Sequence, residues 1–121
     1  MGEIKFPTKK QTIYLVCGKR SDLRVEMAEG YVIDLTNNKG FTTQIALLCK
    51  GKSWYATHFE TGLDCTPKTK TSGELKLHWS RDNLIKRLQE IDFERCLIDR
   101  KGNKVFQYCI DLIEEYKRGN K

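Results

Sequence analysis

The chain has no long apolar run and no hydrophobic leader. None of its apolar stretches approaches the roughly 20 residues that a membrane-spanning helix requires, and residues 1–10 lack the apolar region of a secretion signal. We therefore expect a cytoplasmic protein without a membrane partner. The 121 residues are 39% hydrophobic and 31% charged, a balance that is typical of one globular domain, residues 1–121, with enough chain to bury a core.

The cysteines lack the spacing of a disulfide framework or of a zinc site. Their number is odd, their separations are wide and no Cys-x-x-Cys pair occurs, whereas structural zinc usually draws its ligands from close pairs. We expect reduced thiols that pack as small hydrophobes, and we expect no metal or cofactor. The five positions are Cys17, Cys49, Cys65, Cys96 and Cys109.

Familiar catalytic motifs are also missing. The run Gly51-Lys52-Ser53 resembles the end of a phosphate-binding loop, but Ala46 stands where that loop needs its first glycine, and a strand is expected to follow instead of a helix. Neither a His-Glu-x-x-His motif nor a calcium loop occurs. The carboxylates read as solvated charges, so we do not expect an enzyme.

Strand-like patterns dominate the first half of the chain. β-branched and aromatic residues gather between glycine- or asparagine-rich turns, and Lys50-Gly51-Lys52 predicts a hairpin connection. Residues 22–29 are ambiguous: Ser21 and Gly30 are suited to cap a short helix, while a strand over 23–28 fits almost as well. The other predicted strands are residues 11–17, 31–35, 42–49 and 53–59.

The second half has helical periodicity. Ser80 is a good N-cap for a helix whose apolar residues recur from Leu84 to Ile91. Residues 95–100 form a shorter helical or irregular piece, and residues 104–117 carry the apolar stripe of a last helix. The remaining segments are predicted as an extended arm, a flexible polar loop and a strand-like lead-in, at residues 1–10, 66–73 and 74–79 respectively.

Strands followed by helices indicate the α+β class. We expect an antiparallel sheet of four to five strands with two C-terminal helices packed on one face, where both apolar stripes are buried together. The opposite face would carry Tyr and Thr side chains and stay open to a partner.

One histidine and one cysteine form the only candidate for nucleophilic catalysis. His58 and Cys65 flank the Thr61-Gly62 turn, so a reversing chain would bring them together, with Asp64 or Glu60 orienting the imidazole. The alternative is that His58 caps the turn or packs beside Trp54. A small Cys/His enzyme is therefore one hypothesis among three.

Charge and aromatic residues support a second hypothesis, direct binding to DNA or RNA. The chain has 22 Lys and Arg against 16 Asp and Glu, a net charge of +6, which weakly favours an anionic partner. Cations stand beside aromatics at Lys50, Lys52, Trp54 and Tyr55, where rings would stack on bases and ammonium groups would hold phosphates. Trp54 as a core anchor and the lysines as guards of sheet edges are the alternative.

The segment Trp54 to Leu63 resembles one found in small orphan proteins of phages and other mobile elements. Those proteins carry a Trp-x-x-Thr-His-x-x-Thr-Gly pattern after a hairpin turn, which here is Trp54, Thr57, His58, Thr61 and Gly62. The resemblance covers about a tenth of the chain and carries over no catalytic residue. It implies an accessory protein that blocks a host defence system such as CRISPR.

These observations favour a non-enzymatic binding protein. We expect an anti-CRISPR-like inhibitor that docks on a larger host protein or ribonucleoprotein, since small domains without a catalytic constellation usually act by contact. The expected contact residues are Lys50, Lys52, Trp54, Tyr55, His58, Lys68 and Lys70.

Overall fold

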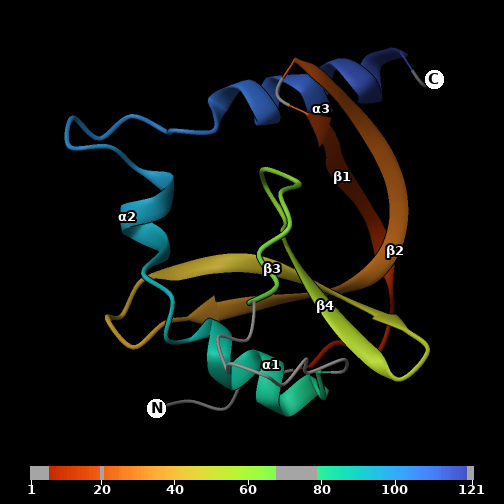
Figure 1. The fold of residues 1–121 in the computed structure, drawn as a ribbon, viewed down its shortest axis with the longest axis vertical. Coiled ribbons are helices and arrows are strands. Elements are labelled where there is room, and N and C mark those ends of the chain that lie inside the picture. The colour runs from red at the N-terminus through yellow and green to blue at the C-terminus, as the bar shows by residue number, and fades with distance from the viewer. Residues whose placement is uncertain (1–5, 20, 68–78, 120–121) are drawn as a thin grey trace.

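Four strands come first along the chain and three helices follow, within the residues that the structure describes (Figure 1). The structure is a computed structural model that describes residues 6–19, 21–67 and 79–119. The predicted α+β class and antiparallel sheet of four to five strands are confirmed, and the described residues form four strands in the order β1-β2-β3-β4. The elements are β1 (Gln11–Lys19), β2 (Asp22–Thr36), β3 (Thr42–Lys50), β4 (Ser53–His58), α1 (Arg81–Leu88), α2 (Phe93–Leu97) and α3 (Gln107–Gly119).

The helix considered for residues 22–29 is wrong, and its strand alternative is correct. These residues form the first part of the 15-residue β2, which pairs antiparallel with β1 from Lys19↔Asp22 to Gln11↔Gly30. In this pairing, backbone N–H and C=O groups of β1 and β2 hydrogen-bond to each other. The helical pattern requires Leu23 and Met27 to be buried together on one stripe. In the structure they are not: Leu23 packs against the α3 cluster, whereas Met27 is 54% exposed.

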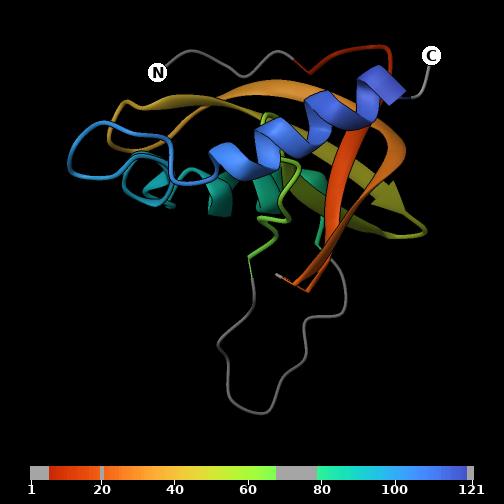
Figure 2. The same cartoon turned by 90° about the horizontal axis from the view of Figure 1, so that it is seen from above.

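The sheet bends sharply where β2 changes partner. β2 pairs with β1 as far as Gly30 and with β3 from Tyr31 onward. A Cβ at Gly30 would lie 2.5 Å from the Ile13 Cδ1 atom and 2.8 Å from the Leu47 carbonyl oxygen. Only glycine therefore lets the two parts of the sheet fold this closely against each other. Figure 2 shows the β1–β2 hairpin leaving the plane of β3 and β4.

A tight turn after β4 reaches back to β1 and closes the curl. The turn is held by hydrogen bonds from the Gly62 N–H to the His58 carbonyl and from the His58 N–H to the Leu63 carbonyl, both 2.8 Å. At its tip the Gly62 carbonyl accepts a 2.8 Å hydrogen bond from the Val16 N–H of β1. The last strand and the first are thus joined through this turn, so that the sheet surrounds a core on its concave side.

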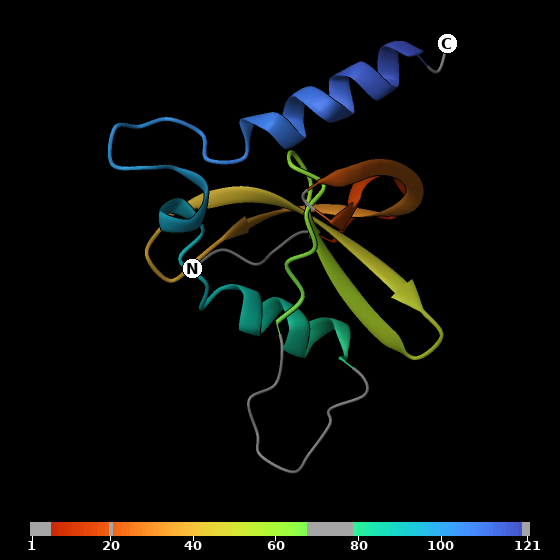
Figure 3. The same ribbon diagram turned by 45° about the horizontal axis from the view of Figure 1, so that its top comes forward.

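The helices pack on β2 at two separate places. Leu84 and Leu88 of α1 lie in a cluster with Ile33 and Leu35, while α3 packs on the β1–β2 hairpin (Figure 3). The α3 cluster is Val16, Cys109 and Ile113, with Leu23 and Val25 packed against it. All the β2 residues in these two clusters have odd numbers, so they lie on one face of the strand, and the bend separates them.

The concave side of the sheet holds a third cluster, which consists of Ile13, Ala46 and Leu48.

The helix boundaries follow their caps. The Ser80 hydroxyl accepts from the Asn83 N–H at 3.3 Å, which confirms the predicted start of α1. Asp92 caps α2 in the same way, so the short helix begins earlier than the predicted piece at 95–100. α3 starts three residues later than predicted because Lys104 pairs with Ile98 in an isolated bridge. No helix in the described ranges is long and apolar enough to span a bilayer.

Substitution of Gly62 by alanine tests the closure. Gly62 has φ of 70°, and an added Cβ would lie 2.5 Å from the Tyr14 carbonyl oxygen. We expect Gly62→Ala to lower the free energy of unfolding by about 2–4 kcal/mol, the sum of left-handed strain and overlap. Gly51→Ala is the matched control: Gly51 has φ of 61° and nothing within 4 Å, so its cost stays near about 1 kcal/mol. The free energies of unfolding are measured by urea denaturation. If Gly62→Ala and Gly51→Ala lower them equally, the contact of Gly62 with β1 does not close the sheet.

Candidate functional site

A hollow of about 560 Å³ opens on the concave side, where the β1–β2 hairpin diverges from the β3–β4 hairpin. Small-molecule and peptide sites are commonly found at such mouths of curled sheets. The strand alternation explains the lining: Leu48 and Lys50 alternate on β3, and Tyr55 lies opposite Leu48 on β4. We call this site the wedge hollow and define it by Leu15, Glu26, Ala28, Leu48, Lys50, Tyr55 and Asp64.

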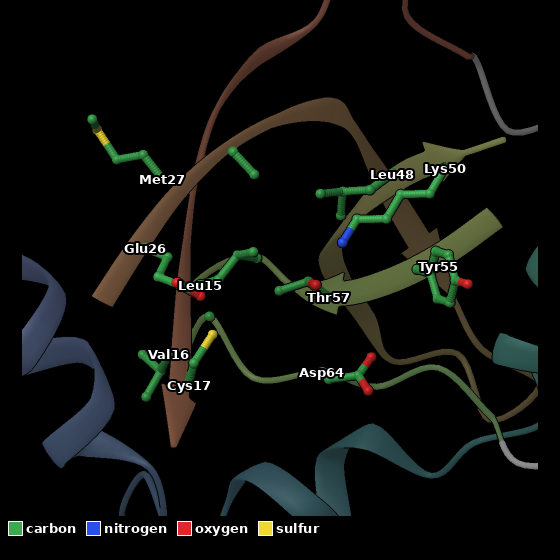
Figure 4. Close-up of a pocket in the computed structure, with 12 residues that line it drawn as sticks. Leu15, Val16, Cys17, Glu26, Met27, Leu48, Lys50, Tyr55, Thr57 and Asp64 are labelled. Atoms are coloured by element: carbon green, nitrogen blue, oxygen red, sulfur yellow. The ribbon is translucent and has the colours of Figure 1, made fainter. Parts of the chain in front are cut away.

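The wedge hollow has an apolar floor and a charged rim. Leu48 is buried in the concave core, and Leu15 and Ala28 pack against that core. Figure 4 shows Lys50 extending over the hollow from β3, with Tyr55 on the neighbouring strand. Tyr55 is 40% exposed, so its ring offers apolar area to a partner while the hydroxyl reaches solvent.

Two carboxylates complete the rim opposite Lys50. Glu26 projects from β2, and Asp64 comes from the segment after the closing turn (Figure 4). The Asp64 Oδ1 atom accepts from the Thr66 hydroxyl at 2.7 Å and from the Thr66 N–H at 3.1 Å. These bonds hold the carboxylate in one orientation. The rim therefore presents both charge signs around an apolar floor.

The thiol of Cys17 at the inner end of the hollow is unsuited to nucleophilic attack. Burial raises the pKa of Cys17, and the hydrogen bond and negative charge of Glu26 raise that pKa further. A thiol with a raised pKa is protonated at neutral pH, whereas the thiolate is the reactive form. Cys17 thus contributes surface to the hollow and no chemistry of its own.

His58, expected as a contact residue, is instead buried in the closing turn at 4% exposure. Its Nε2 atom lies 2.8 Å from the Thr43 hydroxyl, and its Nδ1 atom lies 2.9 Å from the Thr61 hydroxyl. The imidazole stacks on Phe93, with the two ring centroids 6.4 Å apart. Burial lowers the pKa of His58, which favours the neutral ring. This corrects the expectation: His58 anchors the turn and presents no surface to a partner.

The proposed pairing of His58 with Cys65 does not form. Both ring nitrogens of His58 are engaged by threonine hydroxyls. Cys65 lies beside Ala56, whose carbonyl accepts from the Cys65 N–H at 2.9 Å. Burial raises the pKa of Cys65 to about 12, with a smaller contribution from Asp64. Glu60, the other candidate for orienting the imidazole, pairs with a lysine on the connection before α3. The geometry gives no support to the Cys/His enzyme.

Trp54 and Tyr55 are adjacent in β4, so their side chains point to opposite sides of the sheet. They therefore do not form one stacking surface. The Trp54 ring lies 6.0 Å from Phe6 and 6.1 Å from Tyr31. The Arg81 guanidinium stands 4.3 Å above the Phe6 ring, so Trp54 is part of a structural aromatic cluster. Trp54 is only partly buried there, so its place in the contact surface stays a prediction. Lys52 is exposed in the hairpin turn, and the predicted contacts Lys68 and Lys70 lie outside the described residues.

Sequence reasoning missed the β2 and turn residues of the wedge hollow. The helix alternative for residues 22–29 conceals Glu26 and Ala28. The signal for a strand is the alternation of apolar residues at odd-numbered positions 23, 25 and 27 with Arg24 and Glu26 between them. The sequence alone suggests Asp64 only as a group that orients His58. In the ranges 6–19, 21–67 and 79–119, no three His, Cys, Asp or Glu side chains gather in a way that would hold a metal ion.

Comparison with known proteins identifies no relative. The chain matches no protein-family model, and no curated protein or solved structure is significantly similar to it. In the segment Trp54 to Leu63, two residues have structural roles: the Thr61 hydroxyl lies 2.9 Å from the His58 Nδ1 atom, and Gly62 contacts β1. The function of the wedge hollow is therefore argued from its geometry.

The buried imidazole predicts a pH dependence. The folded-state pKa of His58 lies below its ordinary value of 6.5, so the unfolded chain binds more protons as pH falls. The stabilisation is complete above about pH 6.5 and is lost as pH falls from there toward the folded-state pKa. We expect the wild type to lose more stability than His58→Gln between about pH 7 and pH 5. A constant difference between their free energies of unfolding would contradict this assignment.

Thiol reactivity tests the environment of Cys65. Cys49 and Cys96 are exposed, whereas Cys109 is buried and Cys65 has a pKa near 12. With iodoacetamide at neutral pH, followed by peptide mass spectrometry, we expect Cys49 and Cys96 to be labelled first and Cys65 only on unfolding. Labelling of Cys65 in the folded protein as fast as that of Cys49 would revive the nucleophile hypothesis.

Proposed function

We propose that this chain is a non-enzymatic binding protein that docks on a larger protein or ribonucleoprotein through the wedge hollow. The observation that supports this proposal is the exposed ring of Tyr55 next to Lys50, above the apolar floor at Leu48. Aromatic side chains beside desolvated pockets are the usual energetic anchors of protein interfaces. Lys52, on the adjoining turn, extends the contact surface beyond the hollow.

The charges of the hollow favour a protein partner over a nucleic acid. Glu26 and Asp64 share the rim with Lys50, and Arg24 lies beside Glu26 at 3.8 Å. The rim therefore mixes both charge signs, and its carboxylates repel the phosphates that Lys50 would attract. A polypeptide carries both charge signs and apolar side chains, so it complements this rim and floor. Because Trp54 and Tyr55 lie on opposite sides of β4, they cannot offer one stacking surface to successive bases. Direct binding to DNA or RNA is the alternative function.

The biological setting is part of the same proposal. The resemblance of the segment Trp54 to Leu63 suggests a phage or mobile-element accessory protein that inhibits a host defence complex in the cytoplasm, in the manner of an anti-CRISPR protein. A small chain with one built contact site fits such inhibition, because occupying the surface of a larger complex requires affinity and no catalysis.

Capture experiments test the proposal. Tagged protein is incubated with an extract of the host cells, and captured proteins are quantified by mass spectrometry. We expect Tyr55→Ala and Lys50→Glu each to reduce capture of one complex by roughly tenfold, since losing an anchor costs about 1–2 kcal/mol. Lys86→Glu makes the same charge change at an exposed position of α1 and should leave capture unchanged.

Two outcomes would overturn the proposal. One is capture that all three variants retain equally, which would place the contact elsewhere. The other is tight binding to labelled DNA or RNA that Lys50→Glu abolishes and that falls steeply with salt concentration. That second result would establish the nucleic-acid alternative.

A further inference from the structure

The inner edge of β2 is open along the first part of the strand. Asp22 to Gly30 pair with β1 on one side, and pairing with β3 begins only at Tyr31. Among the described residues, none forms a ladder with the other side of residues 22–29. This edge borders the wedge hollow, which is where the two hairpins diverge.

The direction of one hydrogen bond identifies the free backbone groups. The Val16 N–H points away from β2 and donates to the Gly62 carbonyl at 2.8 Å. Val16 lies directly opposite Val25, so this is a pair without mutual hydrogen bonds, and the backbone groups of Val25 also point away from β1. By alternation, the N–H and C=O groups of Leu23, Val25 and Met27 face the open edge.

Within residues 6–19, 21–67 and 79–119, the outer edges of β1 and β4 each receive contacts, whereas the inner edge of β2 receives none. β1 is met at its middle by Gly62, and β4 donates from Trp54 to the Trp79 carbonyl and from Ala56 to the Thr66 hydroxyl. Proteins usually protect an open edge with proline, a bulge or charged side chains, lysine above all. The two charges at the centre of this segment, Arg24 and Glu26, are opposite in sign, so they can pair with a second copy instead of repelling it. Residues 22–29 contain no proline and no lysine, and their register with β1 is unbroken.

We propose that a second copy of this chain pairs with this edge, forming an antiparallel dimer about a twofold axis at Val25. In that register Val25 faces Val25 of the second copy, and Leu23 faces Met27 in both directions. Arg24 then faces Glu26 twice, placing opposite charges directly across the strands. A slide of two residues, the smallest that keeps the same backbone groups on the shared edge, would place either Glu26 against Glu26 or Arg24 against Arg24, and like charges disfavour both registers. This charge complementarity selects a second copy as the occupant.

The dimer would also cover the apolar surface at the edge. Met27 is 54% exposed, and pairing would place it against the half-buried Leu23 of the second copy. The contact is short, so its affinity should be modest, with a Kd of about 1–100 μM. This inference does not depend on the proposed function.

Analytical ultracentrifugation with charge-reversed variants tests the dimer. We expect a monomer–dimer equilibrium between about 1 μM and 1 mM. Arg24→Glu alone and Glu26→Arg alone should each weaken it roughly tenfold, and the double variant Arg24→Glu/Glu26→Arg should restore it, because the pairs re-form with reversed signs. The 3.8 Å Arg24–Glu26 contact within one chain is exposed, so the single variants should still fold. A monomer at every concentration, or no rescue, would overturn the proposal.

A backbone variant gives an independent readout. Met27→Pro removes an N–H that points to the open edge and leaves the ladder with β1 intact, as proline allows at a free edge. We expect it to abolish the dimer, whereas Met27→Ala keeps the N–H and weakens the dimer less. Circular dichroism would verify that each variant is folded. Equal effects of the two variants in folded protein would contradict pairing through the backbone.

Discussion

The hydrogen bond from the Val16 N–H to the Gly62 carbonyl is the interaction on which the rest of this structure depends. It joins the first strand to the turn after the last one, and the turn is positioned by His58 between two threonine hydroxyls. Gly62 is required there because a Cβ would overlap the β1 backbone. A buried histidine that satisfies both nitrogens is costly to disturb, so this turn is a rigid element that keeps the sheet curled.

The bend at Gly30 and this closure together create both features that we assign to binding. On the N-terminal side of Gly30, β2 pairs with β1 and not with β3, so the edge of residues 22–29 that faces away from β1 is open within the described part of the chain. Between the separated hairpins lies the wedge hollow, with Lys50 and Tyr55 on one side and Glu26 on the other. A flat four-stranded sheet would have paired this edge and filled this space. The binding proposals therefore follow from sheet curvature and not from any one unusual side chain.

The strands from residue 31 onward and the N-cap at Ser80 were predictable, because turn residues and alternation are local signals. The state of residues 22–29 was not, since pairing with β1 is a non-local interaction that overrides a weak helical preference. Alternation along β4 already implied that Trp54 and Tyr55 face opposite sides, and grouping them as one surface ignored that rule. Glu26 and Asp64 lie far apart in the sequence, so only the closed sheet brings them to one hollow.

Amide hydrogen exchange, measured residue by residue by NMR in dilute protein, tests the closed sheet and its open edge most directly. The account predicts slow exchange for Val16, whose N–H binds Gly62, and for Glu26, whose N–H faces β1. It predicts fast exchange for the next residue, Met27, whose N–H faces the open edge. Fast exchange at Val16, or equal protection of Glu26 and Met27 in the monomer, would contradict it.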